Sequence, residues 1–190
     1  PISRIEVASA GGYLSYENIA DKATVAGVEV EVRKNLFVRP LSSAANGMNK
    51  LSFGLNGSYI YTNAKMPLAT VTTGSQLEGA APWIANFDLS HNFTKGNHSF
   101  INTLVLNYVS DKIYTIGTQG YQDIMEQGMM TLDFVSQAKL NKYVSLTLKA
   151  RNLLNPSYKL SRKANESGEK VVLSDYKKGI NISLGVSCTF

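Results

Sequence analysis

The sequence GINISLGVSCTF, residues 179–190, alternates between two kinds of side chain. Every second residue is apolar, and the residues between them are small and mostly polar. A period of two is the periodicity of a β-strand, in which successive side chains point to opposite faces. The segment therefore predicts a strand with one apolar face, whose members are Ile180, Ile182, Leu184, Val186, Cys188 and Phe190.

The same alternation recurs along the chain. In VAGVEVEVRK, residues 25–34, small and branched apolar residues alternate with Gly27, Glu29, Glu31 and Arg33. Five further segments alternate in the same way: residues 51–62, 82–93, 98–109, 129–140 and 143–152. With a shorter candidate at residues 4–10, this predicts about eight strands of roughly ten residues, the length that a tilted strand needs to cross a bilayer.

The connections between these segments alternate between short and long. Residues 94–97 and 141–142 are tight turns, and residues 40–49 form a moderate connection, whereas residues 11–22, 64–81, 111–128 and 155–178 form long connections. In an up-and-down meander, alternate connections lie at the same end of the sheet. This asymmetry is typical of an outer-membrane β-barrel, which has short periplasmic turns and long extracellular loops.

The two faces of such a barrel meet different surroundings. Hydrocarbon cannot satisfy a free backbone N–H or C=O, so a sheet in a membrane closes on itself. A Lys or Arg on the lipid face near mid-membrane costs about 2–4 kcal/mol, so charges belong in the lumen. We therefore predict three sets of residues: lipid-facing Ile180, Ile182, Leu184, Val186 and Phe190 in the closing strand; lumen-facing Glu29, Glu31, Arg33, Asp133, Lys149 and Arg151; and interface aromatics Trp83, Tyr108 and Tyr143.

Composition excludes several classes of protein. The chain has 190 residues, 44% of them hydrophobic and 17% charged, and its mean hydropathy is −0.10. It has no run of 18 apolar residues, which excludes a transmembrane helix. The net charge of +5 is scattered through predicted turns and loops, which argues against nucleic-acid binding. Cys188 is the only cysteine, so no disulfide forms within the chain.

No pattern for catalysis, a cofactor or a metal stands out. The carboxylates share the predicted lumen face with basic residues, which favours structural pairing over acid–base chemistry. His91 and His98 flank a tight turn, but no third ligand has suitable spacing. No G-x-S-x-G or phosphate-loop motif is present. We therefore expect neither an enzyme nor a cofactor-binding protein.

Four segments resemble the last third of the barrel of TonB-dependent outer-membrane transporters, in the same order and spacing. Their most specific pieces are Gly27-Val28-Glu29, Ala81-Pro82 followed by Asn86, and Asn152-Leu153-Leu154-Asn155, together with the closing aromatic Phe190. The style is close to that of SusC-like members from Bacteroidetes. The segments are NIADKATVAGVEVEVRKNL, LEGAAPWIANFDLSHNF, LKARNLLNPSY and YKKGINISLGVSCTF.

The resemblance implies a 22-stranded barrel in the bacterial outer membrane, of which residues 1–190 are a carboxy-terminal wedge without the plug domain. It implies import of a nutrient, such as a glycan, a peptide or a metal chelate. The implied partners are the bilayer, the rest of the barrel and plug, and the TonB complex, which acts through the missing amino-terminal part. A SusD-like surface lipoprotein and the outer-membrane assembly machinery, which recognises Phe190, are also implied.

Two alternatives remain open. A complete small eight-stranded outer-membrane barrel with a structural or adhesion role fits the length and strand count, but not the family motifs. A soluble barrel with a ligand inside would turn the apolar faces inward, and the continuous apolar faces with aromatic ends argue against it.

Overall fold

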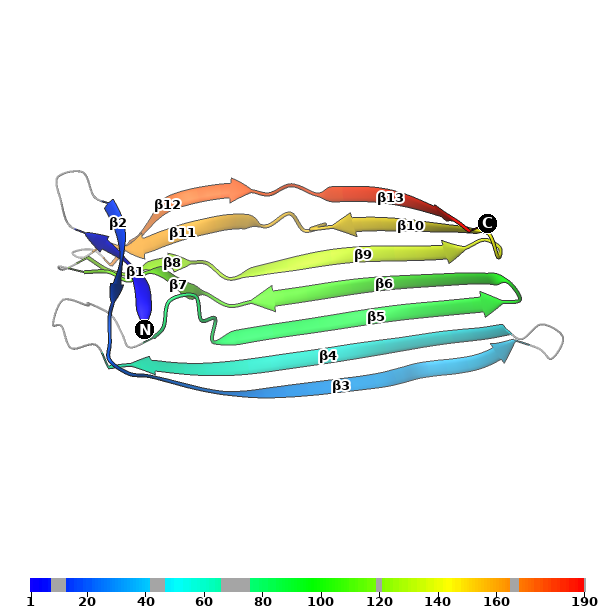
Figure 1. The fold of residues 1–190 in the computed structure, drawn as a ribbon, viewed down its shortest axis with the longest axis horizontal. Coiled ribbons are helices and arrows are strands. Elements are labelled where there is room, and N and C mark those ends of the chain that lie inside the picture. Colours follow the sequence, from blue (N-terminus) through cyan, green and yellow to red (C-terminus); the bar gives the residue numbers. More distant parts are fainter. Residues whose placement is uncertain (8–12, 42–46, 66–75, 119–120, 165–167, 190) are drawn as a thin grey trace.

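The computed structural model describes residues 1–7, 13–41, 47–65, 76–118, 121–164 and 168–189. Within these residues the chain forms β-strands and no helix, and every sheet is antiparallel (Figure 1). The prediction of an all-β, antiparallel protein is confirmed.

Seven strands form the largest sheet, here called the main sheet. Their order is β13-β10-β9-β6-β5-β4-β3, so each strand lies beside its neighbour along the meander. Its strands are β3 (Ala23–Leu41), β4 (Gly47–Ala64), β5 (Trp83–Lys95), β6 (His98–Val109), β9 (Met129–Lys139), β10 (Val144–Arg151) and β13 (Asn181–Cys188).

Local chemistry explains the tight turns of the main sheet. Gly96 joins β5 to β6 with a φ of 57°, a left-handed conformation that glycine adopts without steric cost. In the turn between β9 and β10, Asn141 Oδ1 accepts hydrogen bonds from the backbone N–H groups of Tyr143 (2.8 Å) and Val144 (2.9 Å). Such side-chain acceptors stabilise turns.

The two ends of the main sheet differ as the connection lengths predicted. The tight turns and the carboxy-terminal end of the chain lie at one end, and the long connections and the amino terminus lie at the other (Figure 1). We call the second end the loop end. The predicted alternation of short and long connections is confirmed.

Three of the long connections contain strands that their irregular patterns did not predict, and two of these connections build one sheet together. Residues 111–128 include β7 (Lys112–Thr115) and β8 (Ile124–Glu126), and residues 155–178 include β11 (Ser157–Lys163) and β12 (Lys170–Lys177). These four strands form a second sheet, the loop-end sheet, in the order β12-β11-β8-β7. Register shifts interrupt the pairing of β11 with β12 and of β7 with β8, so no simple alternation marks them.

The candidate strand at residues 4–10 pairs differently from the others. Ile2–Val7 forms β1, which pairs with β2 (Tyr13–Asn18) in a separate two-stranded sheet at the loop end (Figure 1). The N–H of Ile116 donates to the carbonyl of Arg4 at 3.0 Å, so β1 contacts the segment after β7. The main sheet thus has seven strands, and the eighth candidate lies outside it.

A seam of polar contacts separates the main sheet from the loop-end sheet. It runs through residues 110–111, 127–128, 152–156 and 178–180, where the chain passes between the two sheets. Asp111 Oδ1 accepts the N–H of Gly128 at 2.6 Å. A side chain at position 128 would not fit, because its Cβ would lie 2.7 Å from the carbonyl oxygen of Val109.

The asparagines of the motif NLLN form the centre of this seam. Asn152 and Asn155 both have positive φ, at 58° and 44°, a conformation that asparagine tolerates better than most residues. Asn152 Nδ2 donates to the carbonyl of Gly179 at 2.7 Å, and the N–H of Gly179 donates to Asn155 Oδ1 at 3.0 Å. The motif therefore ties the start of β13 to the end of β10.

The apolar core lies at the loop end. Ile5, Ile19, Ile113 and Ile116 form one buried cluster, with Val7 and Met125 packed against it. Every buried hydrophobic residue among those described lies at this end: Ile5, Ile19, Ala20, Ala64, Ala81, Ile113, Ile116 and Ile124. The main sheet is a single layer, and many of its large apolar side chains are exposed.

Candidate functional site

The first group of predicted lumen residues lies together on the polar face of β3, β4 and β5. Arg33 forms an ion pair with Glu31, two residues away on the same strand. Asn56 Nδ2 donates to Glu29 Oε1 at 2.5 Å, and Asn86 Nδ2 donates to Asn56 Oδ1 at 3.3 Å. These residues line a shallow cavity of about 300 Å³ together with Asp88.

The second group lies on β9 and β10, two strands further along the sheet. Asp133 Oδ1 accepts the N–H of Asn152 at 2.8 Å, so this carboxylate supports the seam. Asp133 and Arg151 line a cavity of about 380 Å³ that includes Lys178 and Asn181. Lys149 pairs across the sheet with Ser183 and with Val135. The six predicted lumen residues thus form two separate groups.

The opposite face of the main sheet carries apolar rows that continue from strand to strand. One row crosses five strands through Val32, Leu55, Phe87, Leu106 and Leu132, which are successive partners in the register. One row contains polar residues, since His91, Asn102 and Ser136 are successive partners in the register. Ser136 Oγ donates to Asn102 Oδ1 at 2.7 Å, and His91 Nε2 lies 2.8 Å from Asn49 Oδ1 of the neighbouring row.

The closing-strand residues continue these rows on β13. Ile182, Leu184 and Val186 pair with Ala150, Leu148 and Leu146 of β10. Leu184 is 71% exposed, and Ile180, just before the strand, is 50% exposed. Phe190 lies outside the described residues. That these side chains face lipid stays a prediction, since both faces of this single layer are open.

The predicted interface aromatics lie at both ends of the main sheet. Trp83 begins β5 at the loop end, where its ring contacts Tyr59 with centroids 4.5 Å apart. Tyr108 is near the end of β6 on the same side, and Tyr143 precedes β10 at the tight-turn end. All three are exposed, as side chains at a membrane interface would be.

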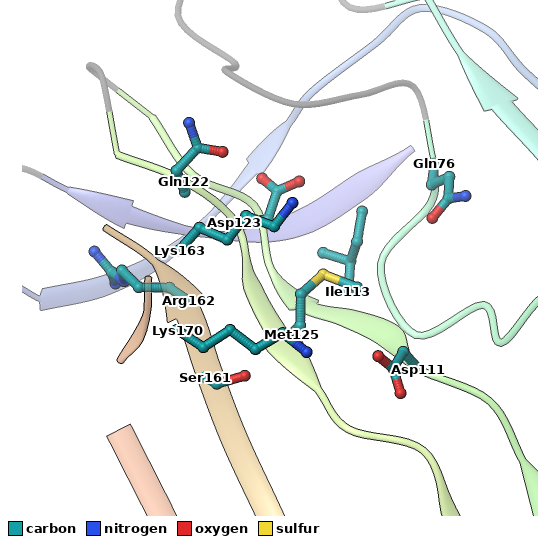
Figure 2. Close-up of a pocket in the computed structure, with 10 residues that line it drawn as sticks. All are labelled: Gln76, Asp111, Ile113, Gln122, Asp123, Met125, Ser161, Arg162, Lys163 and Lys170. Atoms are coloured by element: carbon teal, nitrogen blue, oxygen red, sulfur yellow. The ribbon is translucent and has the colours of Figure 1, made fainter. Parts of the chain in front are cut away.

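A larger cavity lies at the loop end, between the loop-end sheet and the connection before β5 (Figure 2). Its volume is about 530 Å³, within the range of small-molecule sites. The apolar side chains of Ile113 and Met125 line one part of it, and the remaining lining residues are polar or charged: Gln76, Asp111, Gln122, Asp123, Ser161, Arg162, Lys163 and Lys170.

Ion pairs and hydrogen bonds hold the walls of this loop-end cavity. Arg162 pairs with Glu6 of β1, and its guanidinium lies over the ring of Tyr121, with 5.4 Å between Cζ and the ring centroid. Asp123 Oδ1 accepts the N–H of Gly117 at 2.8 Å. The Arg162–Glu6 pair joins residues 156 positions apart, so the sequence pattern gave no signal of this cavity.

Tyr158 of β11 lines the cavity of about 380 Å³, and its phenol has a raised pKa. Its hydroxyl donates to Glu126 Oε2 at 3.1 Å. Burial, followed by the neighbouring Glu126 carboxylate, raises the pKa of Tyr158 to about 12. The phenol therefore remains a neutral hydrogen-bond donor at physiological pH. Lys112 Nζ lies 3.2 Å from the other oxygen of Glu126, so this carboxylate joins β7, β8 and β11.

The described part of the chain shows no cluster of three His, Cys, Asp or Glu side chains that could hold a metal ion. No helix within the described residues is long and apolar enough to cross a membrane.

Comparison with known proteins identifies the family. Residues 3–153 match the family model "TonB dependent receptor-like, beta-barrel". The match ends within the NLLN motif, so β11, β12 and β13 lie beyond it. No curated protein and no solved structure matches the chain. Members of this family are outer-membrane transporters of Gram-negative bacteria and not enzymes. Because the match covers most of the chain, this protein belongs to the TonB-dependent receptor β-barrel family.

Proposed function

We propose that this chain is the carboxy-terminal part of the barrel of a TonB-dependent active transporter that imports a nutrient across the outer membrane. The imported compound is a glycan, a peptide or a metal chelate. The main sheet is the observation that supports this proposal most strongly. It is a single antiparallel layer with continuous apolar rows on one face, and most of it lies within the match to the family model.

The edges of the main sheet support a larger barrel. β3 pairs only with β4, and β13 pairs only with β10, among the described strands. In hydrocarbon, the free N–H and C=O groups of these edges would each cost several kcal/mol. We therefore expect further barrel strands to pair with both edges, and the polar face with Glu29 and Glu31 to contact the plug.

The proposal extends to partners. The motifs around Gly27 and Asn152 resemble SusC-like transporters of Bacteroidetes, which favours a SusD-like lipoprotein at the loop end. TonB would act through an amino-terminal part of the whole protein. The assembly machinery would recognise the closing strand and Phe190.

Growth tests examine the transport proposal. Deletion of the gene should abolish growth on one nutrient in a panel of glycans, peptides and metal chelates. Inactivation of TonB in otherwise wild-type cells should abolish growth on the same nutrient. A loss that occurs in the gene deletion and not after TonB inactivation would contradict active transport.

The size of the native protein tests the larger barrel. Outer membranes should contain a heat-modifiable species that includes this chain and is several times larger than its 20.7 kDa. A heat-modifiable native species of 20.7 kDa would instead identify a complete small barrel.

A further inference from the structure

The loop-end cavity is lined by acidic and basic side chains that differ in the contacts they make. Its lining includes two carboxylates, Asp111 and Asp123. Each already accepts a backbone N–H: Asp111 from Gly128 at 2.6 Å, and Asp123 from Gly117 at 2.8 Å. Both carboxylates therefore hold backbone groups of the cavity wall in place.

Two of the cationic side chains in this lining face each other across adjacent strands. Lys163 of β11 and Lys170 of β12 are directly opposite in the register. Like charges at such positions destabilise a β-sheet pair. Neither ammonium forms an ion pair with the part of the chain that the structure describes. Both lysines are exposed, so an anion arriving from outside can reach them.

The third cation, Arg162, is already paired within the protein. Its guanidinium is fixed by Glu6 through an Nη atom and by stacking on Tyr121. Arg162 Nε is buried and has no hydrogen-bond acceptor among the described residues. Arg162 also precedes Lys163 directly on β11, so the two side chains leave the strand on opposite faces. We therefore assign Arg162 to the cavity wall, which it joins to β1 through Glu6, and not to the groups that meet a ligand.

The opposite wall of the cavity is apolar. Ile113 is buried, and the Met125 side chain lies beside it in the cavity lining (Figure 2). Ligand sites typically combine such apolar surface with a few polar groups that fix orientation. The wall would contact the uncharged body of a ligand while the two lysines hold its charged group.

We propose that the loop-end cavity binds an anionic group, a carboxylate or a phosphate carried on a small organic molecule, through Lys163 and Lys170. The inference rests on the proposed function only in taking the loop end as the face that meets the external medium. For the transporter, this inference means that the imported compound, or a part of it, is negatively charged.

Three matched sugars test this site on the whole protein purified from outer membranes in detergent. Glucuronate and glucose 6-phosphate carry their charged group, a carboxylate or a phosphate, at the exocyclic C6 position, and glucose is the uncharged control. Calorimetric titration should show at least one charged sugar binding about tenfold more tightly than glucose at low salt. The tighter of the two identifies the anionic group. Raising the salt should weaken only the charged sugars.

The variant Lys163→Met with Lys170→Met should bring the affinity for the charged sugars within about twofold of that for glucose. Lys142→Met, which removes a charge at the tight-turn end, is the matched control and should keep the preference. Should the double variant not fold, each single variant is expected to lose about threefold. Equal binding of all three sugars to the wild type, or a preference that persists in the folded lysine variants, would overturn the inference. Either result would leave the TonB-dependent growth phenotype unchanged, so the transport proposal is tested separately.

Discussion

In the main sheet, large apolar side chains such as Leu184 and Val186 are exposed, whereas at the loop end Ile5, Ile113 and Ile116 pack against one another. The two regions are built from the same type of antiparallel strand. They differ in what covers their apolar side chains: the loop end supplies its own core, and the main sheet has no second layer of protein in the described chain.

This difference has a physical consequence. Exposed apolar rows on a single layer are unfavourable in water, but they match hydrocarbon on one face and a polar lumen on the other. The loop end, which would lie outside the bilayer, must bury its isoleucines in protein. The same substitution of an apolar side chain should therefore change stability by different amounts in the two regions.

The largest effect is expected in the core of the loop end. Ile116→Ala should destabilise this region by about 2–5 kcal/mol, because Ile116 is 1% exposed within the isoleucine cluster. Hydrogen exchange of loop-end amides measures the loss. Ile182→Ala on β13 is the matched control, because Ile182 is 69% exposed. It should change stability by about 0.5 kcal/mol or less. Similar losses in both variants would contradict the comparison.

The next effect concerns the faces of the main sheet. Leu106→Lys should destabilise the barrel by about 2–4 kcal/mol, because it puts a charge in the middle of an apolar row. The neighbouring change Asn107→Lys places the same charge on the polar face and should cost much less. Urea unfolding in lipid vesicles measures both. An equal or larger loss in Asn107→Lys would reverse the assignment of the faces.

A smaller effect is expected at the seam between the two regions. Asn155→Ala removes the acceptor for the Gly179 N–H and places alanine at positive φ, which together should cost about 2–3 kcal/mol locally. Asn155→Gly removes only the hydrogen bond and should cost less. Tryptic cleavage after Lys177 and Lys178 reports opening of the seam. Faster cleavage in the glycine variant than in the alanine variant would contradict this explanation.

The smallest effect is at Tyr158. Its folded pKa, raised to about 12, exceeds the ordinary value of 10.0, so the folded loop end keeps a proton that the unfolded chain releases. Stability is full below pH 10 and falls as the pH rises from about 10 to 12. Tyr158→Phe should flatten this decline. Glu126→Gln should flatten it only in part, because burial is the larger cause. Alkaline unfolding curves that coincide with that of the wild type would contradict the assignment.

The residues of the main sheet were predictable because one rule governs them. Alternation located β3, β4, β5, β6, β9, β10 and β13, and connection length located the loop end. The loop-end sheet was not predictable in this way. β8 has only three residues, and β11 and β12 pair with a register shift, so period two is not sustained.

The loop-end cavity could not be found from the sequence for a related reason. Its walls depend on contacts between distant segments, such as Arg162 with Glu6 and Ile5 with Ile116. The polar residues of the apolar face, His91 and Ser136, also break simple alternation, and their cross-strand hydrogen-bond partners become visible only in the register. The NLLN motif could be recognised, but its role in tying β10 to β13 required the fold.

Cysteine labelling in native outer membranes tests the central claim most directly, namely that lipid covers the apolar face of the main sheet and water reaches the polar face. In a Cys188→Ser background, Leu184→Cys should react with a lipid-soluble maleimide and Ser183→Cys with a water-soluble one. The two residues are neighbours on β13 and differ only in the face that they occupy. Labelling of Leu184→Cys by the water-soluble reagent and of Ser183→Cys by the lipid-soluble reagent would contradict the claim.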